Sequence, residues 1–272
     1  MKIYYHNDAD GRCAGAIVLM YTTQTPELIE KSYNKKFEYD KIKIGEEVWL
    51  VDLAISPKEL LAISKRTSNI FWFDHHKSTA EQKYPEIPTM HRSFNLTKCG
   101  AMLVWDYCFP EKSYPLSLKL IDDYDRWIFA LEGTNEFRFG LETIEHDPDS
   151  NIWNELLNSD EEVKNIMLMG NTVINYRDKM TSGLRDMYGF IGELDGTKAY
   201  CLNFYGIGSH AFGNKIKEYD LCIGFIFDGE KWTIGLYSEK IDVSEIAKEY
   251  GGGGHTGAAG FVSNEYPIKN IK

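Results

Sequence analysis

The chain has 272 residues, of which 43% are hydrophobic, and a net charge of −11. That is enough apolar material for one large packed domain or two ordinary ones. The acidic charge argues against a protein that grips long duplex DNA, but it leaves room for a small anionic substrate. No run of about 18 apolar residues occurs and an aspartate lies close to the N-terminus, so neither a transmembrane helix nor a signal peptide is predicted.

The first half of the chain alternates strand-like and helix-like patterns. Short apolar runs typical of buried strands occur at 2–6, 48–52 and 69–74. Helical patterns occur at 12–21, from Pro57 onwards after the N-cap residue Ser56, at 99–109 and at 115–121. Strands that alternate with helices favour an α/β fold with a mostly parallel sheet.

The second half of the chain lacks the regular alternation of strands and helices. Residues 141–151 resemble a loop, and 161–187 form one long helical pattern that is a candidate connector. Hairpins are predicted over 192–203 and 221–237, with helices near 209–218 and 243–249, which together suggest a smaller α+β module. We therefore predict a domain over 1–135, a helical connector over 136–189 and a second domain over 190–272.

Acidic and imidazole side chains stand at the ends of the predicted apolar elements. They are His6, Asp8 and Asp10, then Asp52, then Asp74, His75 and His76, and finally Asp122, Asp123 and Asp125. The carboxyl ends of parallel strands meet at one edge of a sheet, where α/β proteins place their ligands. Carboxylates gathered there repel one another unless cations neutralise them, and two cations about 3.5–4 Å apart are common in phosphoester hydrolysis. Oxygen and imidazole ligands suit Mn²⁺ or Mg²⁺.

The five cysteines form no Cys-x-x-Cys pair. This excludes a zinc site built from paired thiolates and fits reduced thiols in a cytoplasmic protein.

A glycine-rich segment, "YGGGGHTGAAGF", spans residues 250–261. Its backbone amide groups can line an anion, and His255 can donate to a phosphate oxygen. The alternative is a simple flexible glycine turn.

Taken in order, "HNDADG", "VDLA", "FDHHKS", "DDYDRW" and "GGGGHTGAAGF" resemble the motifs of the DHH phosphoesterase family with its DHH-associated C-terminal domain. The plan is most similar to that of nanoRNases, which are oligoribonucleases. The resemblance implies an α/β domain that holds two metal ions, a helical connector, and a smaller domain that binds the substrate.

The resemblance also implies a role for individual residues. His6 and Asp8 match ligands of one metal ion, and Asp10, His75 and the aspartate of the fourth motif match ligands of the other. Asp52 matches the bridging carboxylate, His76 the histidine that acts on the phosphate, and Asp74 a residue that orients the site. The substrate-binding glycine motif matches Gly252, Gly253, Gly254 and His255.

The chain departs from the family pattern in two places. The fourth motif offers several aspartates; we favour Asp125 as the ligand and expect Asp122 and Asp123 to be a solvated helix end. Many relatives carry an arginine-serine pair before the glycine motif, whereas this chain has Ser238-Glu239. Ser238 and Lys240 are the candidate replacements for that pair.

The function predicted from the sequence is that of a cytoplasmic, metal-dependent phosphodiesterase or phosphatase. It would hydrolyse short oligonucleotides or small nucleotides with a water activated by two divalent cations, Mn²⁺ before Mg²⁺. A cyclic or linear dinucleotide phosphodiesterase, an adenosine bisphosphate phosphatase and a non-catalytic nucleotide-binding module remain alternatives. No membrane partner is expected, and the oligomeric state is open, with a homodimer among the options.

Overall fold

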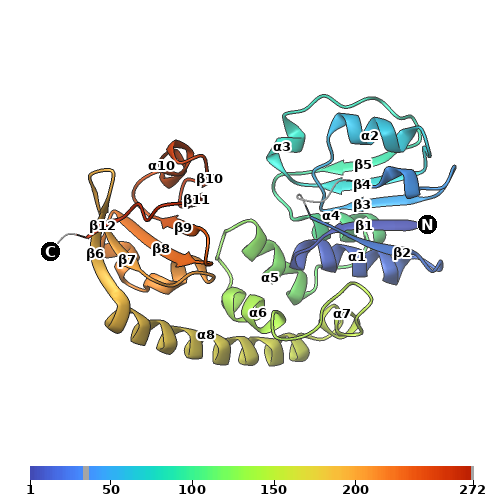
Figure 1. Ribbon diagram of the computed structural model, residues 1–272. Coiled ribbons are helices and arrows are strands. Elements are labelled where there is room, and N and C mark those ends of the chain that lie inside the picture. The colour runs from blue at the N-terminus through green and yellow to red at the C-terminus, as the bar shows by residue number, and fades with distance from the viewer. Residues whose placement is uncertain (33–36, 271–272) are drawn as a thin grey trace. The chain divides into compact units, whose positions relative to one another are not determined.

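The computed structural model describes residues 1–32 and 37–270 (Figure 1). They divide into two compact units, Met1–Val173 and Ile174–Lys272, and the boundary falls within helix α8 (Asp160–Tyr188). No helix in these described ranges is long and apolar enough to cross a membrane. The three functional parts that we expect from the sequence stay a prediction.

The first unit is built on a sheet whose described strands are all parallel, in the order β2-β1-β3-β4-β5. Its strands are β1 (Lys2–His6), β2 (Glu27–Lys31), β3 (Val48–Val51), β4 (Ile70–Asp74) and β5 (His91–Phe94). The α/β class with a mostly parallel sheet is therefore confirmed. The sequence analysis missed β2 and β5, the two edge strands, because neither has the continuous apolar run of a central strand.

Helices cover both faces of this sheet (Figure 1). The helical elements are α1 (Ala9–Tyr21), η1 (Tyr39–Lys41), α2 (Pro57–Ser64), α3 (Lys77–Ala80), α4 (Gly100–Cys108), α5 (Leu116–Asp125), α6 (Thr134–Leu141) and α7 (Ile152–Leu156). Along β1, Ile3 and Tyr5 pack into the core formed with α1, α4 and α5, whereas Tyr4 packs into the core on the α2 side. Burial on both faces explains why the central strands are apolar throughout.

Helix α1 begins three residues earlier than the sequence pattern predicts, at Ala9 instead of Arg12. The reason is Asp8, whose side chain caps the helix: its Oδ1 accepts a hydrogen bond from the Gly11 backbone N–H at 2.9 Å. Aspartate is among the preferred N-cap residues because it satisfies an amide that the helix leaves open. The first motif therefore begins a helix as well as carrying acidic groups.

The second unit contains a mixed sheet in the order β10-β11-β9-β8-β7-β6-β12, in which only the β7–β8 pair is parallel among the described strands. The strands are β6 (Gly189–Leu194), β7 (Thr197–Leu202), β8 (Leu221–Phe227), β9 (Trp232–Tyr237), β10 (Gly253–His255), β11 (Ala258–Ser263) and β12 (Lys269–Asn270). The helical elements are η2 (Gly208–Phe212), α9 (Lys215–Glu218) and α10 (Val243–Glu249). Both predicted hairpins are present, as β6–β7 and β8–β9.

All five cysteines are buried and none forms a disulfide. Burial raises the pKa of Cys108, Cys201 and Cys222 to about 12, and it raises the pKa of Cys13 and Cys99 well above the usual value. The thiols are therefore core groups of low reactivity.

The capping box of α2 provides a test of this fold. The Ser56 side chain accepts from the Glu59 N–H at 3.2 Å, and Glu59 accepts from the Ser56 N–H at 2.9 Å. Replacing Ser56 with Ala should lower the free energy of unfolding by about 1 kcal/mol, measured by urea denaturation. The matched control is Ser64→Ala at the C-terminal end of the same helix, which should change the free energy of unfolding by less than ~0.5 kcal/mol. Equal losses in both variants would contradict the capping role.

Candidate metal centre

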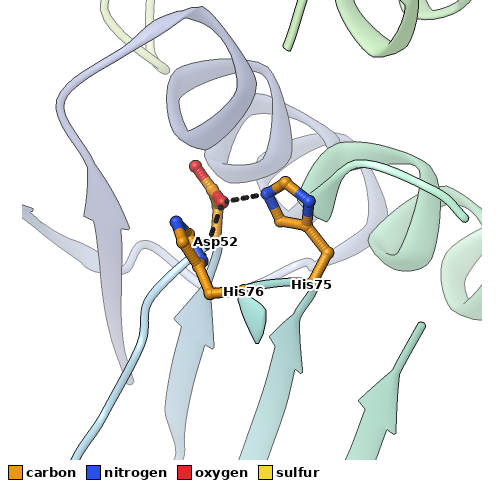
Figure 2. Close-up of side chains that lie close together, drawn as sticks. All are labelled: Asp52, His75 and His76. Atoms are coloured by element: carbon orange, nitrogen blue, oxygen red, sulfur yellow. Dashed lines mark ion pairs between the residues drawn. The ribbon is translucent and has the colours of Figure 1, made fainter. Parts of the chain in front are cut away.

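Three neighbouring strands end at the same edge of the parallel sheet, and the segments "HNDADG", "VDLA" and "FDHHKS" lie at these ends. β1 ends at His6, β3 is followed by Asp52, and β4 ends at Asp74, directly before His75 and His76. Figure 2 shows the side chains of Asp52, His75 and His76 converging above these strand ends. The geometry is the one expected where the carboxyl ends of parallel strands meet.

Asp52 lies in the middle of the cluster. Its Oδ1 is 3.2 Å from His75 Nε2 and 4.0 Å from His76 Nδ1, and its Oδ2 is 3.7 Å from His6 Nδ1. The side chain is 1% exposed, yet neither oxygen makes a hydrogen bond of good geometry. Its backbone has a φ of 54°, in the left-handed region that non-glycine residues adopt at a cost. Asp52 thus combines a strained backbone with a buried carboxylate whose two oxygens make no hydrogen bond, and such a carboxylate is suited to holding a cation.

Groups of metal-ligating atoms, all within 4.8 Å of one another, occur three times in the described residues. They are His6, Asp8 and Asp52; Asp10, His75 and Asp125; and Asp52, His75 and His76. Asp52 belongs to the first and third groups, and His75 belongs to the second and third. Asp52 therefore lies between the two predicted ligand sets, with its Oδ1 beside His75 of the second set. The structure thus brings together the metal ligands expected from the resemblance, and their ligation of metal stays a prediction.

The electrostatics of the cluster show an excess of negative charge. Burial and the neighbouring Asp52 raise the pKa of Asp10 to about 8, and burial and the charge of Asp10 raise the pKa of Asp125 to about 7. Burial alone would lower the pKa of His6 and His75, but the adjacent carboxylates raise both to about 10. Each of these carboxyl groups and imidazoles therefore holds its proton more tightly than usual, because the site lacks positive charge. Divalent cations fit this donor set.

Two glycines allow the cluster to assemble. A Cβ on Gly11 would lie 2.3 Å from the backbone oxygen of His6, and a Cβ on Gly100 would lie 2.6 Å from the Cβ of Asp52. The absence of a side chain at Gly100 lets the start of α4 approach Asp10, whose oxygens accept from the N–H groups of Gly100 and Ala101 at 2.7 Å each. The sequence analysis missed this anchor.

Asp74 holds the paired histidines. Its Oδ1 is 2.6 Å from His76 Nδ1, and it also accepts from the His75 backbone N–H at 2.9 Å. This geometry agrees with an orienting role for Asp74. Burial alone would lower the pKa of His76, but the bond to Asp74 and the charges of Asp52 and Asp74 together raise it. The His76 side chain is 30% exposed against 13% for His75, so His76 is the more accessible of the two imidazoles.

The fourth motif needs a correction. Asp122 and Asp123 are not a solvated helix end, because they are only 8% and 4% exposed. Asp122 accepts from the Cys99 N–H at 2.7 Å and from Arg126 at 3.0 Å. Asp123 accepts from two backbone N–H groups of the following loop and from the hydroxyl of Thr134. One signal was present: α4 starts after Cys99, which cannot cap it well, so its amide groups needed acceptors from elsewhere.

Asp125, in contrast, lies in the cluster. Its Oδ2 is buried, makes no hydrogen bond and is 3.4 Å from His75 Nε2. The structure therefore brings Asp125 to the candidate centre and gives Asp122 and Asp123 structural partners.

The glycine motif lies in the second unit, where Gly253–His255 form β10 at an edge of the sheet. Its tight pairing with β11 explains two of the glycines. A Cβ on Gly252 would lie 2.1 Å from the Gly260 oxygen, and Gly254 has a φ of 150°. The segment thus includes a short paired strand, unlike a simple glycine turn. The exposed side of the segment, including His255, stays a predicted substrate contact.

Ser238, a candidate replacement for the missing arginine-serine pair, has hydrogen-bond partners within the chain. Its side chain is buried, donates to the Asp220 carbonyl at 2.7 Å and accepts from the N–H groups of Lys240 and Ile241. Lys240 itself forms an exposed ion pair with Asp220 at 3.1 Å. The Ser238 hydroxyl therefore stabilises the turn after β9.

Comparisons with known proteins agree with the fold. No family model matches the chain. Two solved structures have a similar fold: the DHH domain of a member of a family of ribosomal proteins, and the pGpG-specific phosphodiesterase PggH from Vibrio cholerae. The first has a TM-score of 0.61 at 13% identity, covering 99% of this chain and 82% of that one. The second has a TM-score of 0.57 at 14% identity, covering 97% and 92%.

The chain has a DHH fold. The fold implied by the motifs is therefore confirmed. A curated relative, "Uncharacterized protein R106" of Acanthamoeba polyphaga mimivirus, is 27% identical over 235 residues, which is 82% of this chain. The match covers 54% of the viral protein, so this DHH-fold chain spans about half of that relative's length.

The position of Asp52 predicts opposite effects on stability and on metal binding. Replacing Asp52 with Asn keeps the shape of the side chain and removes its negative charge. Burial makes that charge unfavourable, because it raises the pKa of the Asp52 carboxyl group. The metal-free variant should be more stable than the metal-free wild type in thermal denaturation. Its affinity for Mn²⁺ should fall by more than about 100-fold, beyond the typical effect of a residue that only orients ligands. The control is Asp40→Asn, an exposed charge change, which should alter neither. Unchanged metal binding in Asp52→Asn would contradict a bridging role.

Asp122 and Asp125 of α5 should behave differently in the same measurements. Asp125→Asn should reduce Mn²⁺ binding with little loss of metal-free stability, because its buried oxygen has no hydrogen-bond partner to lose. Asp122→Asn should lower the metal-free unfolding free energy by about 1–3 kcal/mol, because it weakens the bonds to Cys99 and Arg126. The reverse pattern would show that Asp122 is the ligand.

Proposed function

We propose that this chain is a DHH-family phosphoesterase that uses two divalent cations, Mn²⁺ before Mg²⁺, to hydrolyse short oligonucleotides or small nucleotides. The observation that carries the proposal is Asp52, a buried carboxylate without hydrogen bonds that is grouped with His6 and Asp8 and lies 3.2 Å from His75 of the other ligand set. A single aspartate in that position is what a pair of cations needs as a shared ligand.

The residues divide into two ligand sets around Asp52. His6 and Asp8 would hold one cation, and Asp10, His75 and Asp125 would hold the other. When bound, such cations neutralise the charge of a phosphate and lower the pKa of a water molecule so that it can attack. The donor set of carboxylates and imidazoles, without a thiolate, suits Mn²⁺ and Mg²⁺.

His76 is proposed to act on the phosphate. Asp74 fixes the ring through Nδ1 and stabilises its protonated form. A ring held in this way can donate a hydrogen bond to a phosphate oxygen and a proton to the leaving oxygen. The greater exposure of His76 than of His75 supports this division of roles.

The proposed substrate class is a nucleotide with an accessible phosphate. The net charge of −11 disfavours the binding of long polyanions such as duplex DNA. The shared fold of PggH, whose name describes a pGpG-specific phosphodiesterase, agrees with a small nucleotide substrate. The glycine motif with His255 is proposed to hold the remainder of that substrate through backbone amide groups.

The test is hydrolysis by the purified chain with Mn²⁺. Substrates would be linear and cyclic dinucleotides, short RNA oligomers, adenosine 3′,5′-bisphosphate and pyrophosphate. We expect release of a nucleotide product that chelation abolishes and Mn²⁺ restores. Binding of Mn²⁺ and nucleotides without any hydrolysis would favour a non-catalytic binding module instead.

His76→Ala should lower turnover by about 10²–10⁴-fold, the range for a lost acid–base group, while Mn²⁺ content stays unchanged. Metal analysis beside the kinetics checks this, with His75→Ala as the matched variant that should lose metal as well as turnover. Equal metal loss in both variants would contradict the separate role of His76.

A further inference from the structure

A cavity of about 240 Å³ lies beside the candidate metal centre, within the first unit. One end is formed by Asp8, Asp10 and Asp125, three of the predicted metal ligands. The cavity extends from there between α5 and α6. Its other lining residues are Ala9, Leu120, Ile121, Tyr124, Phe137, Arg138 and Leu141. A group in this cavity would therefore lie directly beside whatever occupies the metal centre.

The lining suits a planar, uncharged ring system. Apart from the carboxylates, the wall is mostly aliphatic and aromatic, with one cation, Arg138. The volume is below the roughly 300–1,000 Å³ of pockets for drug-sized ligands, so it matches one ring system and not a whole dinucleotide. A second phosphate is disfavoured, because three carboxylates line the cavity and Glu142 already pairs with the guanidinium of Arg138.

Arg138 is held in a defined position. Its guanidinium carbon lies 5.3 Å from the centre of the Tyr124 ring. Its helix, α6, packs closely on α8: a Cβ on Gly140 would lie 2.0 Å from the Ile166 oxygen, and one on Gly170 would lie 1.7 Å from the Glu136 oxygen. Only glycines allow this approach, so α6 cannot shift towards α8 without a clash. A planar guanidinium fixed in this way can stack on a base and donate hydrogen bonds to it.

Tyr124 is also buttressed. The rings of Trp127 and Phe129 meet it edge-on, each at 5.7 Å between ring centres. Both residues have positive φ, 57° and 53°, a conformation that aromatic residues rarely adopt. The loop persists in it because Asp123 accepts hydrogen bonds from the following N–H groups and from Thr134. Strain of this kind, beside a cluster of charged groups, is typical of functional sites.

We propose that this cavity binds the nucleobase next to the scissile phosphate, with Arg138 and Tyr124 as its binding residues. The proposal rests on the proposed nucleotide hydrolysis and assigns its specificity to side chains of the first unit. The base is contacted by the guanidinium of Arg138 and the ring of Tyr124, and the apolar wall excludes water from its other face. A base on an aromatic or guanidinium face gains binding energy with little dependence on sequence.

The test compares a diadenylate with an analogue whose base next to the scissile phosphate is absent, in the presence of Mn²⁺. Arg138→Ala should lower the ratio of kcat/KM for the two substrates by about tenfold, equivalent to ~1.4 kcal/mol. Its kcat/KM for the abasic analogue should stay within about twofold of the wild type. The matched control is Glu142→Gln, which breaks the same ion pair but keeps the guanidinium, and it should preserve the wild-type ratio.

A direct binding measurement separates this proposal from the proposed activity. Calorimetry with the Mn²⁺-loaded protein should show tighter binding of adenosine 5′-monophosphate than of ribose 5-phosphate, and Arg138→Ala should lose this preference. If the wild type hydrolyses neither substrate but retains the preference, the activity is wrong and the base site stands. An equal loss on both substrates in Arg138→Ala, or an unchanged ratio, would overturn the base site while the activity stands.

Discussion

The first unit depends on the crowding of carboxylates at one sheet edge. Asp8, Asp10, Asp52 and Asp125 lie around the imidazoles of His6 and His75, and Asp10 and Asp52 are almost completely removed from water. Such a group is unfavourable by itself, since like charges in a low-dielectric site repel and resist ionisation. The chain offsets part of this cost by aiming the first amide groups of α4 at Asp10 and by placing His75 among the carboxylates. The remaining imbalance of charge is what suits the cluster to the binding of cations.

The central part of this arrangement could be predicted from the sequence. His6, Asp52 and the paired histidines each follow a short apolar run. Because parallel strands bring their carboxyl ends together, the proximity of these residues can be predicted without knowing any tertiary contact. The long helix and the two hairpins have strong local patterns and were also predicted. The elements missed in the first unit are the edge strands β2 and β5 and the short helices η1, α3, α6 and α7. They have weak local patterns and depend on packing against the core.

Other features could not be read from local sequence. The burial of Asp122 and Asp123 arises because their partners, the start of α4 and the loop after α5, come from elsewhere in the chain. A run of acidic residues at a helix end gives no sign of whether amide groups will meet it. The cavity beside the centre is similar in this respect, because it forms where α5 and α6 approach the start of α1. The close contact of α6 with α8 also depends on which glycines face each other, and this requires the fold.

The burial of all five cysteines has a practical consequence. Alkylating reagents attack the thiolate, and a thiol with a raised pKa in the core offers almost none near neutral pH. The folded protein should therefore behave as a cysteine-free background towards maleimides. A cysteine introduced at an exposed position would become the one site of labelling, so fluorophores or spin labels could be attached without first removing the native thiols that pack around the sheets.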